Sequence, residues 1–484
     1  MGDPDQSIYC WRGADISNIL DFERDYSDAT TYTLEQNYRS TGNILAAANS
    51  VVKNNSKRIE KSLWTENSAG EKVIFEMARD EHHEAELIAE KIVKTISAEP
   101  SKSYRDFAVF YRTNAQSRVL EEYFIRNNIP YTIVGGLRFY ERKEIKDAVA
   151  YLKVAANPHD SISLLRVINT PLRGIGKTSL ERVTAIARER GASLYDGLKE
   201  ALRQDILSRT RVGPLVALID RLHGDSDKMA PSELCLQLLQ ESGYLAMWEK
   251  EGTDEAESRV ENLHELVAAI KDFETPREEV SLLDFLDQVA LISDIDSFEE
   301  RHNRITLMTL HSAKGLEFPV VFVVGMEEGL FPHSRSLNEN DEMEEERRLC
   351  YVGMTRAMER LFLLCARQRN IFGEYRFQAQ SRFIDEIEPD YLTIENDQAA
   401  TSRFDDDTAM VSDEPYYTME ESQEEWSEGS SWRRGMRVRH PSFGLGKIEQ
   451  CEGAGDTAKL TVAFATFGRK KLIAKYASLT PVSV

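Results

Sequence analysis

Two short apolar runs separated by a polar loop form the clearest pattern in this 484-residue chain. The runs are Ile305–Leu310 and Phe318–Val324, and both are rich in β-branched residues. Runs of this length are typical of buried strands in a parallel or mixed α/β sheet. The loop His311–Glu317 would then lie at the carboxyl end of a strand, where ligands of open α/β sheets bind. An ordinary connection is the alternative that this stretch alone leaves open.

The pattern predicts further strands at residues 73–78, 107–111 and 361–365, alternating with helices. One expected helix carries apolar residues at helical spacing, at Ala85, Ile88, Ala89, Ile92, Val93 and Ile96. Another expected helix begins near Glu344 and brings Arg347, Arg348 and Arg356 towards the sheet. Arginines near strand ends suit phosphate or carboxylate groups, because the planar guanidinium stays charged and binds in a bidentate manner.

Charge is distributed unevenly along the chain, whose formal net charge is −22. Residues 395–428 hold twelve carboxylates and one arginine, whereas residues 432–484 hold ten Lys or Arg and three acids. Overall charge therefore gives no affinity for DNA, and a local basic and aromatic groove would have to supply it. The five cysteines form no CxxC pair, which indicates free thiols in a reducing compartment and predicts a cytoplasmic protein.

Four segments resemble motifs of superfamily 1 DNA helicases, specifically the UvrD/PcrA/Rep group. GDPDQSIYCWRGAD (2–15) is similar to motif III and LEQNYRST (34–41) to motif IV. The loop 311–317 with its flanking strands resembles motif V, and the arginine-bearing helix with Arg356 resembles motif VI. The resemblance implies a bacterial, nucleoid-associated enzyme that uses ATP and Mg²⁺ for 3′→5′ DNA unwinding in repair or replication.

The resemblance also implies roles for single residues. Around ATP it places Tyr38 on the adenine, Glu317 on the ribose, Gln6 and Arg39 at the γ-phosphate, and Arg356 as the arginine finger. Along DNA it places Tyr9 and Trp11 as base-stacking aromatics, Arg12 beside them, His311, His333 and Phe372 on the single-strand track, and Gly174 and Gly176 against duplex phosphate. The run Gly174–Thr178 also mimics a P-loop, but Pro171 stands where that motif needs glycine and no apolar strand precedes it.

In fold class we expect α/β: a RecA-like parallel-sheet domain interrupted by an all-helical insertion, plus a small C-terminal Tudor-like β-barrel. The expected domains are a remnant of a first RecA-like domain (1–34), a second RecA-like domain in two parts (35–132 and 298–394), a helical insertion (133–297), an acidic disordered linker (395–431) and the barrel (432–484).

The 484 residues contain no G-x-x-x-x-G-K-[ST] phosphate loop and no DExx pair after a buried strand. We therefore expect the C-terminal portion of a helicase: a fragment, the product of a truncated gene, or half of a split pair whose N-terminal half acts in trans. Alone it should be inactive, and it should use ATP and Mg²⁺ only together with the missing motifs. The expected partners are single-stranded and duplex DNA and, through the barrel, RNA polymerase. The alternative is a non-catalytic DNA- and polymerase-binding protein derived from such a helicase.

Overall fold

The computed structural model describes most of the chain up to Glu395 and the strands of a C-terminal barrel. The described residues are 2–10, 13–59, 61, 63–226, 228–275, 280–295, 303–371, 374–395, 436–440, 444–452, 459–464, 468–473 and 480–481. The chain divides into two compact units, Met1–Asp407 and Thr408–Val484. Each unit is described by itself below.

A seven-stranded, fully parallel sheet organises the first unit, in the order β11-β3-β8-β7-β4-β6-β5. Its strands are β3 (Val73–Ala78), β4 (Phe107–Tyr111), β5 (Tyr131–Ile133), β6 (Ile305–Thr309), β7 (Phe318–Val323), β8 (Ala357–Ala366) and β11 (Leu392–Glu395). Strands from both sides of the helical insertion therefore lie in one sheet. The predicted α/β class is confirmed, and the sheet is parallel rather than mixed.

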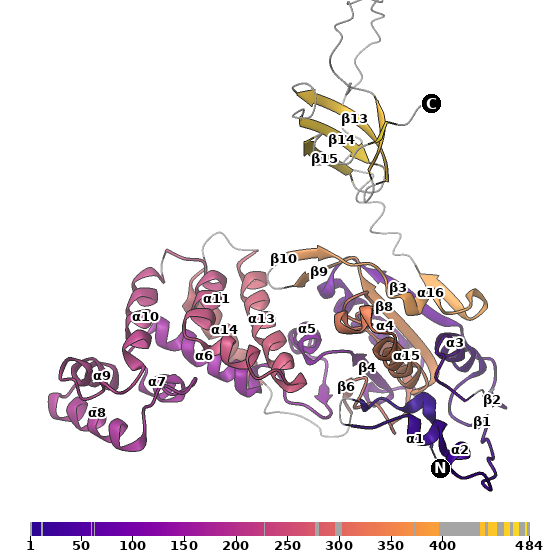
Figure 1. Ribbon diagram of the computed structural model, residues 1–484, viewed down its shortest axis with the longest axis horizontal. Coiled ribbons are helices and arrows are strands. Elements are labelled where there is room, and N and C mark those ends of the chain that lie inside the picture. The colour runs from indigo at the N-terminus through magenta and orange to yellow at the C-terminus, as the bar shows by residue number, and fades with distance from the viewer. Residues whose placement is uncertain are drawn as a thin grey trace, which may run out of the picture. The chain divides into compact units, whose positions relative to one another are not determined.

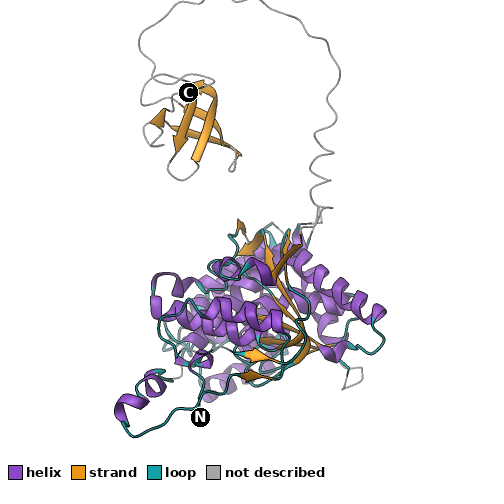
Figure 2. Ribbon diagram, turned by 90° about the vertical axis from the view of Figure 1, so that its right-hand side faces the viewer, coloured by secondary structure: helices purple, strands orange, loops and turns teal. Residues whose placement is uncertain are grey.

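Helices cover both faces of this sheet, as parallel strands require (Figure 1, Figure 2). One face packs on α4 (Glu81–Ala98) and α5 (Ser117–Arg126), and the other on α3 (Gly42–Val52) and α15 (Asn340–Met354). Alternate residues of each central strand enter the two cores, so Phe110 and Val109 face opposite ways. Along α4 the predicted apolar stripe is buried up to Ile92 and half-buried at Ile96, but Val93 is 47% exposed, so this member of the stripe was predicted wrongly.

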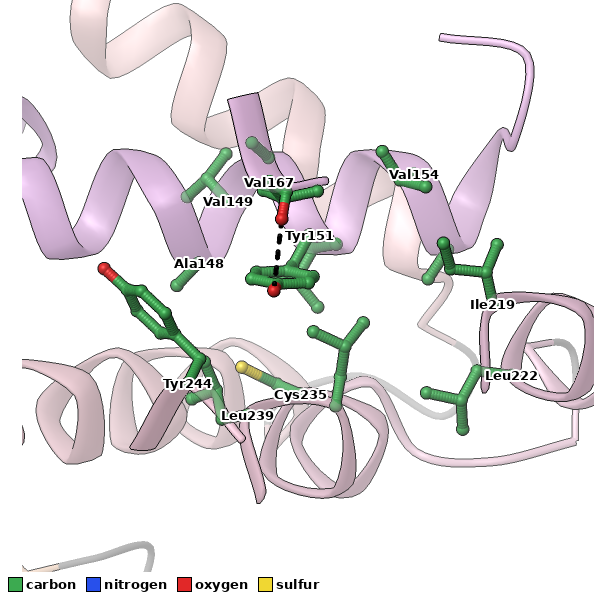
Figure 3. Close-up of a cluster of buried hydrophobic side chains, with 14 of the residues drawn as sticks. Ala148, Val149, Tyr151, Val154, Val167, Ile219, Leu222, Cys235, Leu239 and Tyr244 are labelled. Atoms are coloured by element: carbon green, nitrogen blue, oxygen red, sulfur yellow. Dashed lines mark hydrogen bonds between the residues drawn. The ribbon is translucent and has the colours of Figure 1, made fainter. Parts of the chain in front are cut away.

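The insertion between β5 and β6 is all-helical within its described residues. Its helices are α6 (Lys143–Ala156), α7 (Ser161–Val167), α8 (Lys177–Arg190), α9 (Leu194–Arg203), α10 (Val212–Asp225), α11 (Pro231–Glu241), α12 (Tyr244–Glu249), α13 (Asp254–Glu274) and α14 (Leu282–Ile295). They enclose one apolar core around α6, where Tyr151 and Tyr244 lie among aliphatic side chains (Figure 3). The Tyr151 hydroxyl donates a hydrogen bond to the Val167 carbonyl at 3.5 Å, so the buried phenol is satisfied.

Short elements complete the first unit. They are η1 (Pro4–Gln6), α1 (Ser17–Leu20), α2 (Phe22–Asp25), β1 (Gln36–Asn37), β2 (Trp64–Thr65), η3 (Tyr104–Asp106), η4 (Asn114–Gln116), η5 (Phe139–Glu141), η6 (Ser334–Asn338), the hairpin β9 (Gln368–Ile371) and β10 (Glu374–Phe377), α16 (Arg382–Asp385) and η7 (Pro389–Tyr391). Glu395, where the acidic linker was expected to begin, is the last residue of β11; residues 396–435 lie outside the described part. No described helix is both long and apolar enough to span a membrane.

The second unit contains a five-stranded antiparallel sheet in the order β15-β14-β13-β12-β16. Its strands are β12 (Arg437–His440), β13 (Gly444–Glu452), β14 (Lys459–Phe464), β15 (Gly468–Ile473) and β16 (Thr480–Pro481). The buried side chains Val438, Ile448, Leu460 and Val462 form its interior. The predicted small β-domain at the C-terminus is confirmed.

Candidate functional site

The loop after β6 joins segments that are distant in the sequence, because it crosses from the carboxyl end of β6 to the amino end of β7. The Lys314 ammonium donates to the backbone carbonyl of Gln6 at 2.8 Å. Glu317, at the other end of the loop, accepts from Nε of Arg39 at 2.7 Å. The first residues of the chain and the segment at Arg39 thus both contact the loop after β6.

Arg356 lies between α15 and β8, at the amino end of β8, beside the amino end of β7 that follows Glu317. Its guanidinium donates to the carbonyls of Val352 at 2.9 Å and Leu316 at 3.3 Å, and the residue is 3% exposed. Burial and, after it, the positive charge of Arg39 lower the pKa of Arg356 to about 10. Two guanidinium groups therefore lie close enough to repel each other, and Glu317 pairs with Arg39, an arrangement that favours an additional anion.

Gln6 and Tyr38 complete the set that was predicted to contact nucleotide. The Gln6 amide donates to Asp3 Oδ2 at 2.8 Å, which holds its side chain beside η1. The Tyr38 ring is 78% exposed, and its hydroxyl donates to Gln36 Oε1 at 2.7 Å. A tethered aromatic ring with an open face is suited to stacking on a planar ligand.

Part of the predicted DNA track lies at the loop after β6. The Tyr9 hydroxyl donates to the backbone carbonyl of His311 at 3.1 Å, and the centroids of the two rings are 6.4 Å apart. The Lys314 ammonium lies 5.3 Å from the centroid of the Tyr9 ring. Trp11 and Arg12 lie outside the described residues.

His333 has other neighbours. Its imidazole Nε2 lies 3.4 Å from Glu261 of α13, and its backbone N–H donates to Glu346 at 3.0 Å. The imidazole of His333 thus contacts the helical insertion through Glu261, and its hydrogen-bond partners do not include Tyr9 or His311. Phe372 lies outside the described residues.

Gly174 and Gly176 belong to the loop between α7 and α8, two helices at the opposite end of the first unit from the sheet (Figure 1). Gly174 adopts a left-handed φ of +76°, and Gly176 is the N-cap of α8 with no side chain capping the helix. The preceding element is α7 rather than a strand, so this loop lacks the strand that precedes a P-loop. Its exposed backbone amides at a helix N-terminus are suited to a phosphate.

The sequence did not predict that Lys314 connects the ATP and DNA contacts of this site. Its position in the motif-like loop was visible, but its two contacts depend on how the first ten residues fold over the loop. Through them one ammonium group touches both the Gln6 backbone and the Tyr9 ring, the predicted ATP and DNA contacts.

Three family models match the chain. The UvrD-like helicase C-terminal domain matches residues 32–368, the PcrA/UvrD tudor domain residues 435–481, and the UvrD/REP helicase N-terminal domain residues 1–27. The chain belongs to the UvrD-like helicase family. The resemblance inferred from motifs III to VI is confirmed, as is the Tudor-like assignment of the C-terminal domain.

Relatives in this family are similar over almost the whole chain. A protein named ATP-dependent DNA helicase PcrA from Staphylococcus epidermidis is 44% identical over 492 residues, which is 99% of this chain and 66% of the relative. A protein of the same name from Staphylococcus aureus is 45% identical over 496 residues, with the same two coverages. The chain thus spans about 66% of the length of the curated relatives that it matches.

A solved structure was also matched. It is the C-terminal domain of a possible DNA helicase from a Lactobacillus, and it covers 74% of this chain and 98% of its own with 9% identity. Its TM-score of 0.29 is too low to support an argument.

Proposed function

We propose that this chain supplies one side of the ATP site and part of the DNA track of an ATP-dependent 3′→5′ DNA helicase acting in repair or replication. The observation that carries this proposal is the meeting of Arg39, Glu317 and Arg356 at the amino ends of β7 and β8, with the Gln6 backbone joined to the same loop through Lys314. The two neighbouring guanidinium groups, Arg39 and Arg356, favour a polyphosphate. This proposal extends the family membership to a specific activity of the whole protein.

In this proposal each side chain has a separate task. Tyr38 stacks on the adenine and Glu317 binds the ribose, while Gln6 and Arg39 contact the γ-phosphate. Arg356 stabilises charge on the transferring phosphoryl group, which is the main protein contribution to phosphoryl transfer. Mg²⁺ needs oxygen ligands beyond Glu317, whose carboxylate already accepts from Arg39, so the metal-binding groups belong to motifs absent from this sequence.

Tyr9 and His311 would hold single-stranded DNA by stacking, which contributes about 1–3 kcal/mol per base without sequence preference. Lys314 bridges the Tyr9 ring and the Gln6 backbone, so a change at the γ-phosphate can reach the DNA contact through a single side chain. Gly174 and Gly176 would bind duplex phosphate. His333, Trp11, Arg12 and Phe372 stay predictions for the same track.

The test restores the missing motifs. The 484 residues are fused to, or mixed with, the portion of Staphylococcus epidermidis PcrA that the alignment leaves uncovered, and DNA-stimulated ATP hydrolysis is measured. We expect the fused protein to be active and Arg356→Ala to lower its kcat by about 10³-fold or more. Arg360→Ala is the matched control, because Arg360 pairs with Glu71 and Glu99 outside this site.

The isolated chain is expected to show no DNA-stimulated ATP hydrolysis at saturating Mg²⁺. A rate of about 1 s⁻¹ or faster, within the usual range for enzymes, would contradict this expectation. An inactive fusion whose 484-residue part still binds DNA tightly would instead favour the non-catalytic binding protein.

The barrel is proposed to bind RNA polymerase. Its basic residues include Arg437, Arg439, Lys470 and Lys471, which equally suit nucleic acid. Salt separates the two partners, because phosphate contacts lose orders of magnitude in affinity between about 50 and 200 mM salt. We expect residues 432–484 to retain polymerase at about 200 mM salt and to release duplex DNA. Retained DNA with no bound polymerase would refute the proposal.

A further inference from the structure

A second group of metal-ligating side chains lies at the junction between the sheet and the helical insertion. Glu81 and His82 begin α4, and Asp272 lies near the end of α13. One ligand atom from each lies within 4.8 Å of the other two. The group is separate from the loop after β6, and the proposed ATP and DNA contacts use none of its members.

Two buried oxygen atoms at this junction lack hydrogen-bond partners among the described residues. They are Oε2 of Glu81 and Oδ1 of Asn370, which are 4% and 5% exposed as residues. Asn370 is fixed at the group, because its N–H donates to Glu81 Oε1 at 3.0 Å and its amide donates to Asp272 Oδ1 at 3.0 Å. Buried oxygens without a donor are costly, and a cation would satisfy them.

The surrounding charge also favours a cation. Two guanidinium groups, Arg118 and Arg369, pair with five carboxylates: Glu122, Glu265, Asp272, Glu84 and Glu327. Glu81 adds a sixth carboxylate, so carboxylates exceed guanidinium groups by four. Asp272 has four contacts: its Oδ2 meets Arg118 at 3.0 Å and His82 at 3.3 Å, and its Oδ1 accepts from Asn370 at 3.0 Å and from Tyr375 at 3.5 Å, so a bound ion would take the place of the His82 contact.

We propose that Glu81, His82, Asp272 and Asn370 bind a divalent first-row metal ion, such as Mn²⁺ or Zn²⁺, that joins α13 of the insertion to α4 beside the sheet. Two carboxylates, an amide oxygen and one imidazole form a mixed set of hard oxygen ligands and nitrogen. The imidazole of His82 is 45% exposed, which gives the ion a path from solvent. Bonds of about 2.0–2.2 Å need the ligand atoms, which lie within 4.8 Å of one another, to move closer together when the ion binds.

The test uses the full 484-residue chain and Mn²⁺ alone as the probe. Mn²⁺ is titrated in the presence of millimolar Mg²⁺, which occupies weak surface carboxylates, and free Mn²⁺ is followed by electron paramagnetic resonance. We expect one Mn²⁺ per chain, with affinity at least about tenfold lower in His82→Ala and in Asp272→Asn. Exposed groups elsewhere serve as controls, and His159→Ala and Glu90→Gln should bind as the unchanged chain does.

A spectroscopic measurement separates ligation from a structural effect of the substitutions. Bound Mn²⁺ should show electron spin-echo modulation from one ligating imidazole nitrogen, which His82→Ala removes while the circular dichroism spectrum is unchanged. The proposal fails if no Mn²⁺ binds above the Mg²⁺ background. It also fails if binding survives His82→Ala, or if no imidazole coupling is seen.

Discussion

The sheet and the helical insertion of the first unit bury their apolar side chains in different ways. The core of the insertion is drawn from one continuous stretch, from Phe139 to Val289. Each core of the sheet instead combines residues from before and after that stretch, as Phe110 and Val321 do. The insertion therefore contains its own folding information, whereas the sheet needs two separated segments of the chain.

The junction between these two regions is largely polar. Arg118 of α5, 1% exposed, pairs with Glu265 and Asp272 of α13. Arg142, which precedes α6, donates to Asn262 at 2.8 Å and to Ser117 at 2.7 Å. Each region is thus held together by apolar packing, while ion pairs and hydrogen bonds contribute much of the contact between them. The predictions below test that difference, starting with the largest effect.

Deleting residues 298–394 should abolish folding of the sheet, because it removes four of the seven strands. A fragment of residues 139–295 should in contrast fold alone, with a cooperative helical melt. Both are measured by circular dichroism and size-exclusion chromatography. A second cooperative transition in residues 1–297, beyond the one shown by residues 139–295 alone, would show that the two segments of the sheet are not interdependent.

Arg118→Ala should destabilise the junction by about 3–5 kcal/mol, since it leaves three buried or half-buried carboxylates without their partner. Thermal unfolding should then separate into two transitions, with the insertion core melting last. Leu152→Ala, in the insertion core, should lower the free energy of unfolding by about 2–5 kcal/mol. In this variant the melting temperature of the insertion should fall, rather than that of the junction. A single, equally shifted transition in both variants would show that the regions melt as one.

The junction should also respond to pH through Glu121. Burial raises the pKa of this carboxyl to about 7, although Arg142 lies 3.8 Å away and the Phe139 N–H donates to it. The Tyr131 hydroxyl, at 3.4 Å, and the adjacent Glu122 also face it. At pH values between the ordinary pKa of 4.5 and about 7, Glu121 binds more protons in the folded state than in the unfolded state. Stability is therefore lost as pH rises through this window.

This group should contribute a slope of up to about 1.4 kcal/mol per pH unit. Urea unfolding at about pH 5, 6, 7 and 8 measures it, and the difference between the unchanged chain and Glu121→Gln isolates this carboxyl from other titrating groups. We expect Glu121→Gln to flatten the profile. An identical slope in both proteins would rule out Glu121 as the source.

The smallest expected effect compares two glycines of the α7–α8 loop. A Cβ at Gly176 meets no atom within 4 Å and the φ of −95° suits alanine, so Gly176→Ala should leave stability unchanged. If a duplex phosphate approaches the backbone N–H of residue 176, the added Cβ should keep the phosphate at a distance. The affinity of Gly176→Ala for duplex DNA should then fall by about fivefold, which corresponds to the loss of one hydrogen bond. Gly174→Ala should instead lower stability by about 1–2 kcal/mol, because its φ is +76°. Fluorescence anisotropy with a tailed duplex measures binding, and wild-type affinity in Gly176→Ala would exclude the backbone contact.

The central sheet was predictable because its strands are apolar, β-branched runs. The bounds of β3 and β4 were predicted at 73–78 and 107–111, and β6 and β7 end one residue before their predicted ends. The edge strands β5 and β11 were not predicted, since three or four residues give too little periodicity. Strand order was also beyond the sequence pattern, because it depends on pairings between distant segments.

The candidate site also has a part that the sequence predicted and a part that it did not. Motif-like segments identified Arg39, Glu317 and Arg356, whose side chains the structure brings together at the amino ends of β7 and β8. The contacts of Lys314 and the pairing of His333 with Glu261 could not be read from the sequence. They depend on how the first residues and α13 pack against the loops of the sheet.

One topological feature has a consequence for how the chain folds. The edge strand β5 pairs with β6 in the register Tyr131↔Ile305, so the whole insertion serves as the crossover that two parallel neighbours require. Closing a loop of this length in an unfolded chain is entropically costly, and contacts so distant in sequence slow folding. An insertion that collapses first would shorten that loop by holding its two ends in place. The helical insertion would then have to fold before β5 and β6 pair, and its folding rate would set an upper limit on the rate at which this edge of the sheet forms.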